Sequence, residues 1–160
     1  MDNSAPTIIE IKGKTLIGMS KSMSYTQDKT KELWQGFGPR IKSISHKKDN
    51  LMYSVNIYPT DFHENSIDPD KRFVKWAAIE VNQKEKQEGL DFLEIESGKY
   101  AVFLHKGTAD NFRPLMEFIF NDWIPNSEYE LDHRPHFEVL RPGYMPDDPN
   151  AEEEVWIPIK

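Results

Sequence analysis

One acidic residue stands within a short apolar segment near the C-terminus, a position typical of a ligand-binding side chain. Glu138 lies in His136–Leu140, where the alternation of a strand places its side chain opposite Phe137 and Val139. If those two point away from the helices, Glu138 points toward them. A carboxylate buried there must be paired, hydrogen-bonded or held for a ligand, because burying a lone charge is costly. The alternative is an exposed glutamate on an edge strand, and the strand pattern alone leaves both open.

Aromatic residues that could form the walls of a pocket are abundant. The chain has nine Phe, six Tyr and four Trp. A predicted helix over Asn111–Ile124 carries two apolar stripes, whereas a simple amphipathic helix needs one. One stripe can pack on a sheet while the other faces a groove; the alternative is a thick core that uses both. The first stripe holds Leu115, Phe118 and Ile119, and the second holds Phe112, Met116, Phe120 and Trp123.

Other patterns that could do chemistry are incomplete. His133 and His136 are three residues apart, but Pro135 separates them and no third ligand is evident, so we expect no metal site. The absence of cysteine excludes disulfides and thiolate chemistry. The run Glu152–Glu154 is expected to be solvated. We therefore assign no catalytic residue and expect no cofactor. Three further histidines have no partner at a recognisable spacing: His46, His63 and His105.

The hydrophobic pattern predicts the same order of elements twice, a strand, a helix and two strands. In the first unit these are Thr7–Ser20, Tyr25–Ile44, Leu51–Tyr58 and Phe73–Val81. In the second they are Asp91–His105 (a strand pair or one bent strand), Asn111–Ile124, His136–Leu140 and Val155–Ile159. We expect Gly13 to bend the first strand, Thr26 to cap the first helix, and Thr108 or Asp110 to cap the second.

Short sequence matches between the two units indicate an internal duplication, with repeats at about 1–82 and 88–160. Ile9–Ile11 matches Leu93–Ile95, and Trp76 closes the first repeat much as Trp156 closes the second. One helix and a short sheet cannot close a core alone. The sequence therefore predicts a single α+β domain over residues 1–160, with an antiparallel sheet and both helices on one face. The groove between the helices is the natural place for a ligand.

Composition and charge limit the classes of function. The chain has 160 residues, 38% of them hydrophobic, and a net charge of −7 that is concentrated after residue 80. Because it lacks a dense basic stripe, we expect no direct binding to nucleic acid. No apolar run is long enough to cross a bilayer and no signal peptide is evident, so we expect a cytoplasmic protein without membrane contact.

A set of short motifs spread over nearly the whole chain resembles the GyrI-like superfamily, also called the AraC-type effector-binding domain. Each motif is degenerate alone, but together, and in this order, they are specific. They are Ile17–Gly18, Leu33–Arg40, Ala77–Val81, Gly98–Gly107, Asp122–Pro125, His136–Glu138 and Glu154–Ile159.

The resemblance implies tandem β-α-β-β repeats with pseudo-two-fold symmetry and a groove in which Glu138 meets cationic or polar ligands amid aromatic side chains. The family's aromatic position before Ile-Pro is Trp156 here. Since the first strand begins at about Thr7, we expect the stand-alone form without a helix-turn-helix module. We expect the ligand contacts to come from Glu138 with Trp123, Trp156, Phe120, Tyr100, Phe103, Trp34, Phe37, Trp76 and Tyr58.

Three functions are compatible with these residues. The leading hypothesis is a binding protein for an amphipathic small molecule, cationic or polyaromatic, with aromatic walls and Glu138 as counter-charge. The alternative is a hydrolase that opens strained cyclopropane rings, with Glu138 as general base. The third is a modulator of a protein partner, as the gyrase-directed members of the family are, and its only support here is the acidic second half.

Overall fold

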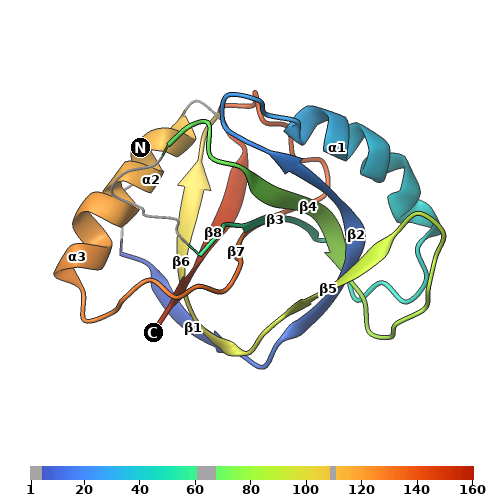
Figure 1. Ribbon diagram of the computed structural model, residues 1–160, viewed down its shortest axis with the longest axis horizontal. Helices are drawn as coiled ribbons and strands as arrows, with labels where there is room; N and C mark the ends of the chain where they lie inside the picture. Colours follow the sequence, from blue (N-terminus) through green and yellow to red (C-terminus); the bar gives the residue numbers. More distant parts are fainter. Residues whose placement is uncertain (1–4, 61–67, 109–110) are drawn as a thin grey trace.

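The β-branched and aromatic segments of the chain form one antiparallel sheet with the strand order β1-β6-β8-β7-β3-β4-β2-β5 (Figure 1). The structure is a computed structural model that describes residues 5–60, 68–108 and 111–160. In the described residues the strands are β1 (Thr7–Ile11), β2 (Lys14–Met23), β3 (Met52–Ile57), β4 (Phe73–Glu80), β5 (Asp91–Ile95), β6 (Gly98–Lys106), β7 (His136–Leu140) and β8 (Glu152–Ile159).

The helical segments are shorter and less regular than the sequence pattern predicts. Residues that were expected to form one helix over 25–44 form an α-helix followed by a 3-10 turn, because the chain tightens at the pair Gly38-Pro39. A π-helical stretch interrupts the second helix. The segments are α1 (Thr30–Phe37), η1 (Gly38–Ser43), α2 (Phe112–Phe118), η3 (Ile119–Trp123) and α3 (Ile124–Asn126).

The start of the first helix also differs from the prediction. The backbone N–H of Thr30 donates to Asp28 Oδ1 at 2.9 Å, whereas Thr26 bonds to Asp70 at 2.6 Å and does not cap the helix. At the second helix no side chain caps the first turn, and the Thr108 carbonyl accepts from the N–H of Asn111 at 3.0 Å. The alternative cap, Asp110, lies outside the described residues.

Both helical segments pack on the same face of the sheet, as expected. In β4, Ala77 and Ile79 contact the α1 cluster, while Trp76 and Ala78 belong to a cluster on the opposite face. The same alternation holds in β8 for the α2–α3 cluster. Figure 1 shows α1 and α2–α3 at separate corners outside the curved sheet. We call the face under the helices the helix face and the other the inner face. None of the described helices is long and apolar enough to span a membrane.

The first and fifth strands pair across the sheet with the other unit. β1 pairs with β6, with Ile9 opposite Tyr100, and β5 pairs with β2, with Leu93 opposite Leu16. The segment that was expected to form one strand over Thr7–Ser20 is thus two strands, because the chain turns at Gly13, whose φ of +121° is disfavoured for any residue with a Cβ.

The centre of the sheet is the pair β3–β7, which lies between the two helical corners. Its register places Ser54 opposite Glu138 and Val55 opposite Phe137. Trp76 lies opposite Val55 and Trp156 opposite Phe137 on the next strands out, so both tryptophans are in the inner-face cluster.

Candidate ligand-binding site

The alternation of β7 decides where Glu138 points. Phe137 and Val139 are buried in the inner-face cluster, so Glu138 stands on the helix face. It is not on an edge strand, because β7 is paired with β3 on one side and β8 on the other. The orientation that the sequence left open is therefore toward the helices.

The strands on either side bring further ionisable groups to the same face. His105 on β6 lies opposite Glu153 on β8, and Glu153 is the diagonal, same-face neighbour of Glu138 on β7. His105 Nδ1 lies 2.9 Å from Glu153 Oε1, and the Glu153 carboxyl is hydrogen-bonded to that of Glu138. We call this row of His105, Glu153 and Glu138 the carboxyl row.

Burial sets the protonation of the carboxyl row. His105 is 2% exposed and Glu153 is 5% exposed. Burial, then the charge of Glu138 and the hydrogen bond to it, raises the pKa of Glu153 well above its ordinary value, and Lys75 opposes this weakly. Burial also lowers the pKa of His105. At neutral pH Glu153 is therefore a carboxylic acid that donates to Glu138, and His105 is a neutral imidazole that donates to Glu153.

Three tyrosines from three segments face the carboxyl row. Tyr25 and Tyr58 share a hydrogen bond of 2.8 Å between their hydroxyl oxygens, and Asn56 donates to Tyr58 at 3.2 Å. Burial raises the pKa values of Tyr25, Tyr58 and Tyr144, and the charge of Glu138 adds to the shift of each. These neutral hydroxyls and rings line a half-buried, negatively charged site.

Aromatic rings extend these walls to both helical corners. The Tyr58 ring lies 5.3 Å from Phe73 and 5.0 Å from His136, and Phe120 from the π-helical segment lies 6.3 Å from His136, between ring centroids. Burial lowers the pKa of His136 to about 3, so this ring is neutral. Rings from both units therefore meet around His136, the first residue of β7, two residues before Glu138.

A lysine supplies the positive charge of the site in the free protein. Lys75 on β4 acts on Glu153 electrostatically and donates to the Thr30 hydroxyl at 3.1 Å. Burial acts to raise the pKa of Asp28, but the hydrogen bonds from Thr30, and then the charge of Lys75, lower it overall. Lys75 is thus shared between Thr30 of α1 and Glu153 of the carboxyl row.

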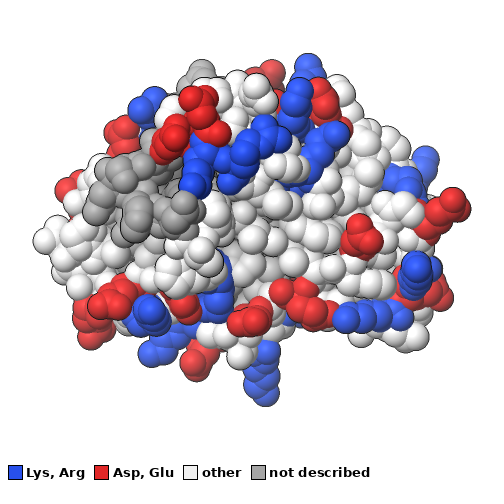
Figure 2. Space-filling model, viewed as in Figure 1, with Lys and Arg blue, Asp and Glu red and all other residues white. Residues whose placement is uncertain are grey.

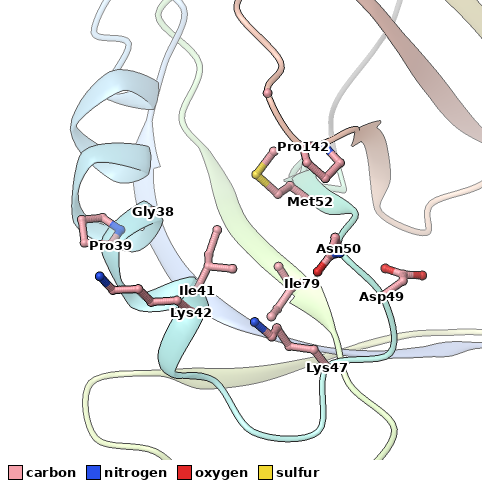
Figure 3. Close-up of a pocket in the computed structure, with 11 residues that line it drawn as sticks. Gly38, Pro39, Ile41, Lys42, Lys47, Asp49, Asn50, Met52, Ile79 and Pro142 are labelled. Carbon is pink, nitrogen blue, oxygen red and sulfur yellow. The ribbon is translucent and has the colours of Figure 1, made fainter.

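A pocket of about 460 Å³ lies along the same face, toward the start of β3 (Figure 3). Its floor includes Met52 and Ile79, with Ile41 from η1 on one side and Pro142 on the other. Met52 is two residues before Ser54, the partner of Glu138, so floor and carboxyl row are about 7 Å apart along β3. Lys42, Lys47 and Asp49 also line it, with Gly38, Pro39, Asn50 and Gly143.

Figure 2 displays the charges on one face of the molecule. A band of basic side chains crosses its upper part, basic and acidic side chains are mixed around the rest of the rim, and the centre carries few charges. Among the described residues no group of three or more His, Asp or Glu could hold a metal ion. The carboxyl row is a largely buried cluster of ionisable groups on the helix face.

Comparison with known proteins assigns the family. Residues 4–160 match the family described as the GyrI-like small molecule binding domain. The chain belongs to the GyrI-like family. It is 28% identical over 155 residues to the transcriptional regulator BrlR of Pseudomonas aeruginosa, covering 95% of this chain but only 54% of BrlR, about half its length. It is 29% identical over 136 residues to a DNA gyrase inhibitor of Escherichia fergusonii, covering 76% of this chain and 86% of that protein.

A solved structure extends the likeness to three dimensions. SAV2435 bound to tetraphenylphosphonium superposes with a TM-score of 0.75 at 17% identity, covering 98% of this chain and 94% of the other. The α+β fold and the small-molecule binding class that the sequence indicated are thus confirmed for this GyrI-like chain.

The GyrI-like fold separates the predicted contact residues into three groups. Glu138 belongs to the carboxyl row, while Tyr58 and Phe120 both lie near His136, Tyr58 packed on the α1 core and Phe120 buried in the α2–α3 core. Four belong to or pack on the cores between the helices and the sheet: Trp34 and Phe37 of α1, and Phe103 of β6 with Trp123 of η3. Three lie on the inner face, across the sheet from Glu138: Trp76, Tyr100 and Trp156. The seven side chains of the last two groups are part of, or pack on, the hydrophobic cores.

Sequence reasoning missed His105 and Glu153. The run Glu152–Glu154 was expected to be solvated, but Glu153 is buried, and His105 has a partner 48 residues away. A signal for Glu153 was present, since it alternates with Val155 and Ile157, whose side chains are buried under α2. No local signal could have paired His105 with it, because the β6–β8 register joins distant segments.

Proposed function

We propose that this GyrI-like domain binds a lipophilic cation on the helix face, with the Glu138 carboxylate as the counter-charge. The observation that carries the proposal is the carboxyl row, which holds one negative charge in a half-buried site bordered by tyrosine rings. A cation is favoured there by the charge and by the ring faces, each good cation–π contact contributing roughly 0.5–2 kcal/mol. The complex of SAV2435 with tetraphenylphosphonium, a cation on the same fold, supports the choice.

The pocket beside the carboxyl row supports an elongated or branched ligand. Its volume of about 460 Å³ is within the range of small-molecule sites. The ammonium groups of Lys42 and Lys47 make it a poor place for a positive centre. We therefore assign the charge of the ligand to Glu138 and an apolar arm to the floor of Met52 and Ile79. The buried Asn56 Oδ1, which has no hydrogen-bond partner among the described residues, can accept from a ligand N–H.

Titration with tetraphenylphosphonium tests the proposal. Glu138→Gln keeps the shape of the side chain and removes its charge, so affinity should fall by about 1–3 kcal/mol, the value of a charge-assisted contact. Glu152→Gln is the matched control, because it removes a half-exposed carboxylate from the adjacent residue of the same strand that carries Glu153. Neutral triphenylphosphine oxide should bind wild type and Glu138→Gln alike. Equal affinity of both proteins for the cation would refute the role of Glu138.

A hydrolase is the second candidate, favoured by the different protonation of two adjacent carboxyls. Glu138 as carboxylate and Glu153 as acid form a base and an acid side by side, the arrangement that general acid–base chemistry needs. Water would lose a proton to Glu138 as its oxygen bonds a carbon of a strained ring, the ring C–C bond would break, and its electron pair would take up the proton of Glu153. Incubation with a cyclopropane electrophile should then yield a product heavier by one water, lost in Glu138→Gln. Binding without turnover would leave the first proposal standing alone.

A further inference from the structure

The buried pair His105–Glu153 occupies a position that the fold fills with apolar side chains elsewhere. Trp156 on β8 lies opposite Val102 on β6. Three residues before Trp156 is Glu153, and it lies opposite His105, three residues after Val102. In the first unit, Trp76 on β4 lies opposite Ser20 on β2. The matching step, three residues before Trp76, leads to Phe73, which lies opposite Met23. The latter two are 5% and 0% exposed, as buried as Glu153 and His105. Packing at this position therefore does not require ionisable groups.

The carboxyl row stores a proton next to the charge that the ligand meets. Glu153 lies between His105 and Glu138, and its acid O–H is directed to the Glu138 carboxylate. With neutral His105, the three groups together carry one negative charge. Loss of that single proton would double the negative charge and replace the hydrogen bond between Glu153 and Glu138 by repulsion between two carboxylates, which a nearby cation can offset.

Other groups facing the row do not supply a proton at neutral pH. Tyr25, Tyr58 and Tyr144 have raised pKa values and stay protonated, and burial keeps His136 neutral. Phe112 from α2 packs edge-on against the His105 ring at 5.6 Å and carries no charge. Lys75 from β4 is the positive group that acts on Glu153, and Asp28 lies beyond it. Among these described groups, the exchangeable proton is that of Glu153.

Resting on the proposed function, we propose that the Glu138–Glu153 pair adjusts its charge to the ligand, binding monocations with its proton retained and dications with the Glu153 proton released to solvent. The Glu153 O–H bond breaks, its electron pair stays on the carboxylate, and the proton passes to the buffer. The physical reason is Coulombic. One positive charge pairs with Glu138, which is already ionised, whereas a second charge within about 4–6 Å favours ionisation of Glu153 by one to three pKa units. The domain thereby accepts two classes of cation in one site.

Calorimetry with two biaryl probes tests this inference. The monocation 1-methyl-4-phenylpyridinium and the dication 1,1′-dimethyl-4,4′-bipyridinium share a frame and differ in charge. At about pH 8.5, titrations in buffers of different ionisation enthalpy should give a released proton number near zero for the monocation and toward one for the dication. Because burial raises the pKa of Glu153 to about 10 in the free protein, the affinity of the dication should rise by up to tenfold per pH unit within the range of about pH 7 to 10, while that of the monocation changes little. Equal proton release by both probes would overturn the inference.

The variant Glu153→Gln tests whether the proton released on binding of the dication comes from Glu153. Its amide keeps hydrogen bonds to both neighbours, so the monocation should still bind, but proton release and the pH dependence for the dication should vanish. Persistence of the release in this variant would overturn the assignment to Glu153. Tetraphenylphosphonium is titrated in parallel: if its binding does not depend on Glu138, the proposed function fails, whereas intact Glu138 dependence without extra proton release for the dication rejects only this inference.

Discussion

The buried acid Glu153 should make the stability of the free protein depend on pH. Its pKa is raised in the folded state from an ordinary value of 4.5, so above that value the unfolded chain binds fewer protons than the folded one. Stability is therefore full below the unfolded pKa and is lost as pH rises toward the folded pKa. His105 and His136 act oppositely, since burial lowers their pKa values from 6.5, but only below that pH.

Above pH 6.5 the two histidines no longer contribute, and the effect of Glu153 on the pH dependence of the unfolding free energy remains. One group contributes about 1.4 kcal/mol per pH unit, so unfolding free energy should fall by about 2 kcal/mol between pH 6.5 and about pH 8. Glu153→Gln carries no titrating proton and should lack this loss, so the variant gains on wild type by that amount over the same interval. Residues that titrate elsewhere in the chain contribute equally to both proteins and cancel in the difference.

Urea denaturation of wild type, Glu153→Gln and Glu152→Gln at several pH values measures these slopes. The half-exposed Glu152 forms a surface ion pair with Lys106 at 3.9 Å, so its variant should follow wild type. Parallel curves for wild type and Glu153→Gln would show that Glu153 is ionised in the folded protein, and the argument for a stored proton would fail with it.

Three further substitutions separate ligand recognition from folding. Lys75→Met should raise the affinity for tetraphenylphosphonium several-fold, because it removes a positive charge that acts on the carboxyl row; unchanged or weaker binding in the same titration would contradict this. Trp156→Ala should lower the free energy of unfolding by about 3–5 kcal/mol, since its ring stacks on Phe137 at 5.1 Å in the inner core, while ligand affinity of the folded protein changes little; a selective loss of binding would argue against that placement. Gly18→Ala should prevent stable folding, because its Cβ would lie 2.0 Å from the Ala77 carbonyl oxygen, and circular dichroism of a normally folded variant would refute this.

The sequence was sufficient where a property depends on near neighbours along the chain. Alternation around Glu138 predicted which side of its strand it occupies, conditional on Phe137 and Val139, and those two do lie in the inner core. The two-unit order of strands and helices also followed from local hydrophobic periods. The ends of the first helix did not, because Asp28 rather than Thr26 bonds its first turn and the chain tightens at Gly38.

The contacts of the site join residues that are far apart in the sequence, and no local pattern predicts such pairs. The contact between His105 and Glu153 exists only because β6 and β8 pair in one register, and the inner position of Trp156 follows from the direction in which β8 presents its faces. An acidic run also looks the same in sequence whether it is solvated or enters a strand. Glu153 is buried since it is the second residue of β8, which begins three residues earlier than the hydrophobic pattern indicates.

The exchange of β1 and β5 has a consequence for dividing the chain. β1 of the first unit is hydrogen-bonded to β6 of the second, and β5 of the second is hydrogen-bonded to β2 of the first. A connection of two residues joins β1 to β2 at Gly13, and another joins β5 to β6 just before Gly98. A fragment that ends between β4 and β5 would keep β1 without its partner β6, and would expose the edge of β2 that β5 normally covers. An unpaired edge is a template for another strand. In a dimer of such fragments, β1 of each copy can pair with the exposed edge of β2 in the other. The isolated first unit should therefore dimerise rather than remain a folded monomer.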